Sequence, residues 1–188
     1  MDTSIPADDR GRLLAEARLA AADALAGRPP RAVEAEGIFA RRAGVFVSLH
    51  VDGDLRGCIG HPAGDRPLAS VVPQCAVAAA TGDPRFSAVS QAELARCVIE
   101  ISVLGPITVV HDPGEIIVGR HGLIAEQGSR RGLLLPQVAT EHGWDRDAFL
   151  ERTCGKAGLP PDAWKRGATI SRFEAEVFDD ADAGRRSP

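Results

Sequence analysis

The chain has 188 residues, a formal net charge of −4 and 26% charged residues, which predicts one soluble globular domain with a sizeable core. The acidic balance argues against a nucleic-acid-binding surface, and no apolar run approaches the roughly 20 residues that cross a bilayer. Residues 1–10 are polar and acidic rather than apolar, so we expect no signal peptide and a cytoplasmic location.

The first half of the chain predicts two helices on either side of a β-hairpin. Residues 8–26 repeat apolar side chains at helical spacing, and Gly27 ends the repeat. Residues 37–60 hold two alternating segments around an Asp-Gly turn, which is the pattern of a hairpin. A second helix is expected to begin at Pro67, because proline is favoured in the first turn of a helix.

The second half adds short strands and helices. Ser90 and Glu93 form a capping box for a short helix, and residues 97–104 alternate as a strand does. The other expected elements are strands over 123–126, 132–135 and 169–178, and helices beginning at Pro136 and Asp145. Helices and antiparallel strands are mixed without βαβ alternation, so we predict an α+β fold in which helices flank an antiparallel or mixed sheet. We predict one domain over 1–178 and a disordered tail over 179–188.

The register of the hairpin decides which side chains share a face. A two-residue loop would place Arg56 opposite Leu49 on the apolar face, where an unpaired guanidinium is costly. A three-residue loop, Val51–Gly53, with a glycine bulge places Arg56 opposite Ser48 and separates apolar from polar side chains. We therefore predict the three-residue loop. The polar face then holds Ser48, His50, Asp54, Arg56 and Cys58.

Cys58 is the strongest candidate for chemistry on this face. The thiolate is the reactive form of cysteine, and a neighbouring cation such as Arg56 lowers the pKa of the thiol. His50, on the paired strand, could act as the base. The alternative is that Cys58 is a half-buried small apolar residue. The other cysteines show no CxxC spacing and are expected to be free thiols in the core: Cys75, Cys97 and Cys154.

Arg56 and Glu100 each have a functional and a structural interpretation. The Arg56 guanidinium, together with the backbone amides of Gly57 and Gly60, suits a carboxylate or a phosphate. The alternative is an ion pair of Arg56 with Glu100 or Asp54. Glu100 could be a general acid or base if its carboxyl is desolvated, or the inert partner of Arg56.

Two further residues are candidate ligand contacts. Arg85 belongs to an Asp-Pro-Arg-Phe turn, whose other interpretation is a plain turn that anchors Phe86 in the core. His121 lies in a glycine-rich loop, where it either lines a ligand site or is simply solvated. The histidine and cysteine spacings match no standard zinc site, so no metal is predicted. The glycines form no dinucleotide or P-loop fingerprint, and no cofactor is identified.

Several motifs, in order, make the chain resemble the AMMECR-one family over nearly its whole length. The signature is the hexapeptide Leu55–Gly60, LRGCIG, which is preceded by Gly44–Leu49. The other matching motifs are Asp83–Phe86, Ile99–Leu104, Gly122–Leu123, Leu135–Ala139 and Lys156–Leu159.

The resemblance implies a two-lobed α+β fold with the signature hairpin near a cleft. It supplies no reaction, but it implies partners: related bacterial and archaeal proteins are encoded beside, or fused to, a Memo-type protein and a radical S-adenosylmethionine protein. His61 follows the hexapeptide where the family usually has threonine. It therefore places an imidazole near Cys58 that relatives lack, which makes His61 another candidate ligand contact.

Two functions remain open. In the first, the protein is an enzyme, or an enzyme subunit, for a small anionic substrate. Cys58 is then the nucleophile or attachment point, Arg56 clamps the anion, and Glu100 or His50 transfers the proton. In the second, the protein is a non-catalytic module that docks a segment of the Memo-type or radical S-adenosylmethionine protein, with Arg56 serving recognition.

Overall fold

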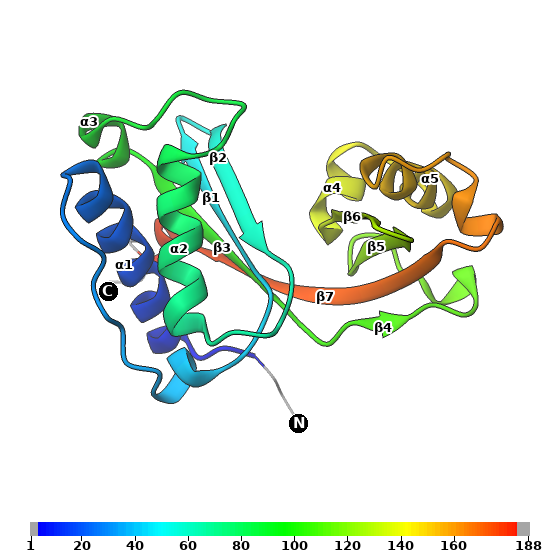
Figure 1. Ribbon diagram of the computed structural model, residues 1–188, viewed down its shortest axis with the longest axis horizontal. Helices are drawn as coiled ribbons and strands as arrows, with labels where there is room; N and C mark the ends of the chain where they lie inside the picture. Colours follow the sequence, from blue (N-terminus) through cyan, green and yellow to red (C-terminus); the bar gives the residue numbers. More distant parts are fainter. Residues whose placement is uncertain (1–3, 184–188) are drawn as a thin grey trace. The chain divides into compact units, whose positions relative to one another are not determined.

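The computed structural model describes residues 4–183, which form two compact units (Figure 1). The second unit is Leu104–Ala175, and the first consists of the chain before and after it. Both units combine helices with antiparallel strands, which confirms the predicted α+β fold. Within residues 4–183, no helix combines the length and the apolar character needed to cross a membrane.

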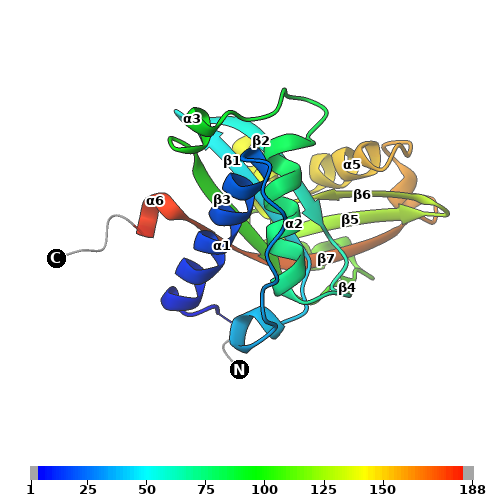
Figure 2. The same ribbon diagram turned by 60° about the vertical axis from the view of Figure 1, so that its left-hand side comes forward.

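In the first unit, two long helices pack side by side, and one of them lies over the hairpin (Figure 2). The hairpin strands and the strand that follows them are in the order β2-β1-β3. The elements are α1 (Ala7–Leu25), η1 (Gly37–Ala40), β1 (Val45–Val51), β2 (Asp54–His61), α2 (Leu68–Thr81), α3 (Gln91–Leu94), β3 (Val98–Leu104) and α6 (Asp180–Ala183). The predicted helices, hairpin strands and Ser90–Glu93 capping box are confirmed.

The core of the first unit lies between one stripe of each long helix and one face of the sheet. Leu13 and Ala17 of α1, Val71 and Val72 of α2 and Val47 of β1 are all fully buried in it. Burial of each large apolar side chain contributes about 1.5 to 3 kcal/mol to folding. The sheet face that carries Val47 is therefore occupied by packing, and any site on this sheet belongs to its other face.

The hairpin closes with a two-residue loop, and the predicted three-residue loop is wrong. Val51 pairs with Asp54, and Asp52 and Gly53 both have positive φ (53° and 91°), as a type I′ turn requires. A β-bulge lies beside this turn, because His50 pairs with Leu55 while Leu49, the residue before His50, pairs with Gly57. Arg56 is the extra residue of this bulge, so it leaves the ladder instead of entering the apolar face.

The second unit has its own core. Its strands β7, β5 and β6 are neighbours in that order, and β4 pairs with β7. Helix α5 packs on β6 and β5, where a Cβ at Gly132 would lie 2.2 Å from the backbone of Ala157. The elements are β4 (Thr108–Val109), η2 (Pro113–Glu115), β5 (His121–Gln127), β6 (Arg130–Leu134), α4 (Pro136–Glu141), α5 (Arg146–Lys156), η3 (Ala163–Lys165) and β7 (Thr169–Asp179), which from Glu176 onward belongs to the first unit.

The C-terminal tail predicted from residue 179 does not begin there. Asp179 ends β7, residues 180–183 form α6, and residues 184–188 lie outside the described part of the chain. The physical reason is Asp180, whose carboxylate accepts hydrogen bonds from Arg18 of α1 and from the backbone N–H of Ile99. These bonds hold the start of α6 against α1 and β3.

Candidate functional site

Three polar side chains form a row across the sheet of the first unit. Cys58 of β2 pairs with Ser48 of β1, and Ser48 pairs with Glu100 of β3. Side chains alternate along each strand, so this row lies on the face opposite that of Val47. The predicted association of Cys58 with Ser48 on one face therefore holds, although the pairing of individual residues differs from the prediction.

The Cys58 thiol is neutral in this setting. It is partly buried, and burial is the main cause that raises its pKa above the ordinary value. A hydrogen bond from Ser48 and the charge of Arg85 act in the opposite direction, while the carboxylates of Asp83 and Glu100 raise the pKa further. A thiol with a raised pKa is a poor nucleophile near neutral pH.

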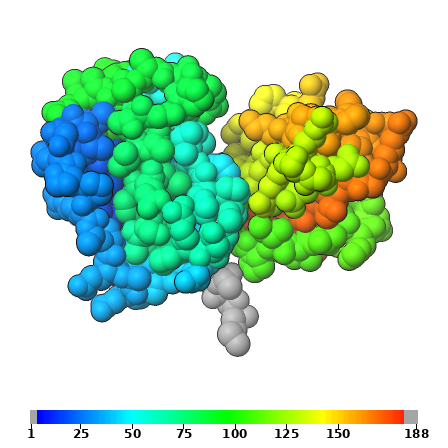
Figure 3. Space-filling view, in the orientation of Figure 1, coloured from blue at the N-terminus to red at the C-terminus, as the bar shows by residue number. Residues whose placement is uncertain are grey.

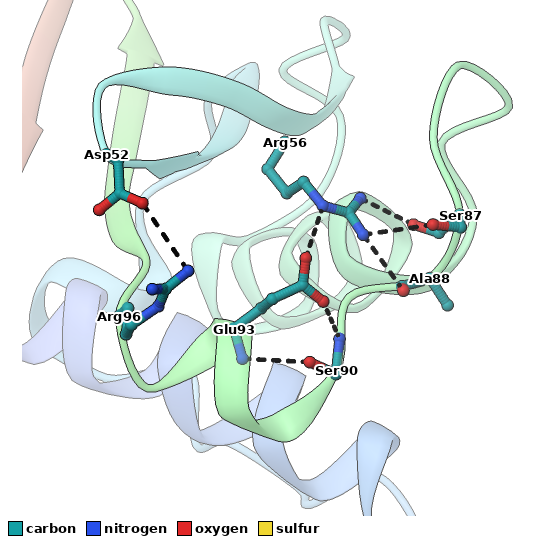
Figure 4. A network of polar contacts seen from close by, with 7 residues as sticks. All are labelled: Asp52, Arg56, Ser87, Ala88, Ser90, Glu93 and Arg96. Carbon is teal, nitrogen blue, oxygen red and sulfur yellow. Dashed lines mark hydrogen bonds and ion pairs between the residues drawn. The ribbon is translucent and has the colours of Figure 1, made fainter.

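Arg56 is engaged by the segment that leads into α3 and does not join the polar row (Figure 4). Its Nε donates to the Glu93 carboxylate at 3.0 Å, and its Nη groups donate to the Ser87 carbonyl at 2.8 Å, the Ser87 hydroxyl at 3.3 Å and the Ala88 carbonyl at 3.4 Å. Glu93 also accepts the Ser90 N–H within the capping box. We call these contacts the Arg56 brace.

The partners of Arg56 correct the sequence interpretation. Of the two interpretations left open for Arg56, anion binding or an ion pair with Glu100 or Asp54, the structure shows an ion pair, but its partner is Glu93. The bulge is the reason, because it turns Arg56 out of the ladder toward the chain before α3. The sequence indicates Glu93 only as a capping residue. Its hydrogen bonds with both Ser90 and Arg56 lower its pKa to about 2, well below its usual range.

The Asp-Pro-Arg-Phe turn holds the free edge of β2. Asp83 accepts the Cys58 N–H at 2.9 Å, and Arg85 donates to the Cys58 carbonyl at 3.4 Å. The two side chains also bind each other, with Arg85 Nη2 at 2.7 Å from an Asp83 oxygen whose side chain is only 2% exposed. Arg85 and the backbone donors hold the pKa of Asp83 far below its usual range. Together they take the place of a neighbouring strand.

The glycines of the signature are sites of close packing. A Cβ at Gly57 would lie 2.1 Å from the Ala79 carbonyl oxygen of α2, and a Cβ at Gly60 would lie 2.2 Å from the Phe46 ring. No real Cβ tolerates such approaches, so larger residues at either position would displace the strand. These contacts explain the glycines without a ligand.

Two of the predicted histidines lie along the hairpin. His50 lies two residues from Ser48 on β1, hence on the same face, and its Nε2 is buried without a hydrogen-bond partner among residues 4–183. His61 ends β2 and contacts the Asp65 carboxylate at 2.6 Å. That contact is the main cause that holds the pKa of Asp65 below its ordinary value.

His121 belongs to the second unit, where it is a buried strand residue rather than a solvated loop residue. It is 3% exposed, and its Nδ1 accepts the Ile117 N–H at 3.1 Å. Its Nε2 lies 3.2 Å from Arg172. Burial, followed by the charge of Arg172, lowers the pKa of the imidazole.

The structure therefore groups Cys58, Ser48, Glu100 and His50 on one sheet face and separates Arg56 from them. Within the part of the chain that is described, no three His, Cys, Asp or Glu side chains are arranged to hold a metal ion. Two further site residues were given no role from the sequence: Ser48, which was placed only on the polar face, and Asp83, which was placed only in the turn. Their signals were a serine alternating with apolar residues and an aspartate at the start of a turn.

A family model described as AMMECR1 matches residues 14–178. The chain belongs to the AMMECR1 family. It is 48% identical to a protein of Methanosarcina barkeri over 146 residues, which are 75% of this chain and 72% of that protein. It is 46% identical to a protein of Methanothermobacter thermautotrophicus over 180 residues, which are 90% and 94% of the two chains.

A solved structure also resembles the chain over most of its length. The crystal structure of an uncharacterized protein of Pyrococcus horikoshii matches with a TM-score of 0.83 and 39% identity, and the match covers 89% of each chain. The names of this AMMECR1 relative and of the two archaeal proteins state no activity.

Proposed function

We propose that this AMMECR1 family protein acts as a non-catalytic interaction module. The observation that carries the proposal is the Arg56 brace. The one guanidinium of the signature hexapeptide is bound to Glu93, Ser87 and Ala88, and its side chain is 18% exposed. An arginine held in this way fixes the shape of a surface, because its donors are already used inside the protein.

The brace connects two exposed segments that together form the proposed contact surface. One is the tip of the hairpin, where Leu55 is 37% exposed. The other is Pro84–Ser87, where the Arg85 side chain is 53% exposed and its guanidinium carbon lies 5.3 Å from the Phe86 ring centre. We call Leu55 and Pro84–Ser87 together the tip surface. The exposed Leu55 and the exposed Arg85 suit a partner segment that carries both an apolar residue and a carboxylate.

The partners that we propose are the Memo-type and radical S-adenosylmethionine proteins encoded with members of the family. The test is a pull-down of each purified partner from the same genome by the full chain. We expect the wild type and Cys58→Ser to capture a partner equally, whereas Arg56→Ala and Leu55→Ser lose most of the capture. Arg12→Ala changes an exposed arginine outside the tip surface and is the matched control.

Comparison of the two variants distinguishes the loss of a contact with the partner from the unfolding of the protein. Leu55 is exposed, so Leu55→Ser leaves the core intact even if Arg56→Ala destabilises the hairpin. If wild type captures neither partner, or if Leu55→Ser captures as much as wild type, the proposal is wrong.

A second candidate function is favoured by the polar row. Cys58, Ser48 and Glu100 are neighbours across three strands, with His50 on the same face. In this alternative the protein is an enzyme for a small anionic substrate, Cys58 is the nucleophile, and Glu100 or His50 moves the proton. Arg85 would then supply the cation near the sulfur, because it lowers the pKa of the Cys58 thiol.

A further inference from the structure

A groove of about 440 Å³ lies between α1 and α2, apart from the polar row and the tip surface. Ala20 and Ala24 of α1 and Pro73, Val77 and Ala78 of α2 give it an apolar lining. Figure 3 shows residues of the α1 region beside α2 on this surface of the unit. The volume is within the range of sites for small ligands.

The chain after α1 forms a third wall of the groove. Gly27, with φ of +68°, reverses the chain, and Pro30 then lines the groove. The segment is tied back by Asp23, whose side chain is 4% exposed and accepts hydrogen bonds from Arg28 Nε at 2.6 Å and Arg31 Nε at 2.7 Å. These hydrogen bonds hold the pKa of Asp23 below its ordinary value, so the carboxylate stays charged.

Two guanidinium groups share this one carboxylate. Each binds Asp23 through Nε, and their terminal Nη groups make no hydrogen bond with the described residues. Both side chains line the groove and are more than half exposed, at 56% for Arg28 and 55% for Arg31. Glu16 also lines the groove, where burial raises the pKa of its carboxyl and the charge of Arg31 acts in the opposite direction. The mouth of the groove therefore offers free N–H donors that carry positive charge.

We propose that this groove binds a small amphipathic carboxylate, a molecule with one carboxyl group on an apolar chain or ring. The apolar part lies between the helices against the alanines and Pro73. The carboxylate accepts hydrogen bonds from the Nη groups of Arg28 and Arg31, a geometry for which guanidinium is well suited. This site is independent of the proposed interaction function, because none of its residues belongs to the tip surface.

Calorimetric titration of the full chain with decanoate, decanol and decylamine tests the proposal, since the three probes share one tail and differ in their head groups. We expect decanoate to bind about tenfold more tightly than decanol, because a charge-assisted hydrogen bond contributes on that scale. Decylamine is expected to bind most weakly. Arg31→Gln is expected to lower the affinity for decanoate about tenfold and to leave that for decanol unchanged.

Two more variants complete the test. Arg96→Gln removes an arginine that, like Arg31, is more than half exposed but does not line the groove. We expect this variant to bind all three probes as the wild type does. Ala20→Phe fills the groove and is expected to abolish binding of decanoate and decanol, with helicity and melting temperature as checks on folding. Arg31→Gln changes an exposed side chain and keeps the test valid if Ala20→Phe unfolds. Equal affinity for the three probes, or decanoate binding that Arg31→Gln leaves unchanged, overturns the proposal.

Discussion

The surroundings of Cys58 shift the pKa of its thiol in two opposite directions. Burial raises the pKa of the thiol, whereas the Ser48 hydrogen bond and the Arg85 charge favour the thiolate. The raised pKa shows that burial dominates. The residue therefore behaves as a protonated thiol at neutral pH, although a cation and a hydroxyl group lie close to it.

Alkylation of Cys58 by iodoacetamide tests which of the two candidate functions is correct. We expect a slower reaction near pH 7 than for a free cysteine peptide, and a steeper rise in rate only under alkaline conditions, because the raised pKa lowers the thiolate fraction. Peptide mapping separates Cys58 from the buried cysteines. A rate above that of the free peptide at neutral pH would contradict the interaction module and favour the enzyme.

Gly57 offers a second test at the residue scale. Gly57→Ala places a methyl group against the Ala79 carbonyl, so we expect it to lower the free energy of unfolding by about 2 kcal/mol or more. The matched control is Gly11→Ala, which lies in α1 with nothing within 4 Å of its new Cβ. The control is expected to raise the free energy by about 0.5 to 1 kcal/mol. Urea unfolding measures both, and equal stability of Gly57→Ala and wild type would contradict the packing role.

At the scale of elements, the hairpin and α3 are joined by the Arg56 brace. The pKa of Glu93 is lowered to about 2 by the hydrogen bonds from Ser90 and from Arg56. A carboxyl with a lowered pKa in the folded protein stabilises it above the unfolded pKa of 4.5, and this contribution is lost as pH falls toward 2. The brace is therefore sensitive to acid.

Replacement of Glu93 with glutamine tests this linkage. We expect Glu93→Gln to be less stable than wild type at neutral pH, and the difference in free energy of unfolding to shrink as pH falls from about 4.5 toward 2. Denaturant unfolding at a series of pH values measures it. A stability difference that stays constant across this window would show that Glu93 is not coupled to the brace.

The elements were far more predictable than the contacts between them. Apolar periodicity located both ends of α1 within one residue, and Pro67 marked the start of α2 within one residue. The Ser90 capping box is local chemistry that can be read directly from the sequence. The position of the bulge could not be predicted in the same way. Both loop lengths place Cys58 on a strand, and only contacts with the rest of the protein determine which residue is left unpaired. Glu93 and Asp83 could not be predicted as partners of the signature strand, because neither residue is near that strand in the sequence.

At the scale of the whole molecule, each unit has a separate core. Phe178 and the two long helices contribute to the core of the first unit, and Phe149 and Leu123 contribute to that of the second. The second unit leaves and rejoins the chain at neighbouring points, because the Gly105 N–H donates to the Glu174 carbonyl at 2.8 Å. A short connection can therefore replace it without straining the ends.

Excision of the second unit tests this organisation. We expect a chain in which a short glycine–serine linker replaces Leu104–Ala175 to unfold cooperatively on heating and to keep the helical circular dichroism of the first unit. A fragment that stops at Val103 is the control, and it should be much less stable because it lacks Phe178 and the Asp180 contacts with α1. A linker-joined chain without a cooperative transition would mean that the first unit depends on the second.

The division of the first unit between the two ends of the chain has a consequence for its synthesis. Ile5 donates its backbone N–H to Glu176, and Arg18 binds Asp180, so segments that precede the second unit are completed by segments that follow it. A nascent chain on the ribosome therefore holds the amino-terminal helices and hairpin without their closing strand while the inserted unit is translated. The inserted unit has all its residues available earlier and can fold first, whereas the outer unit becomes complete only after the inserted unit has been translated.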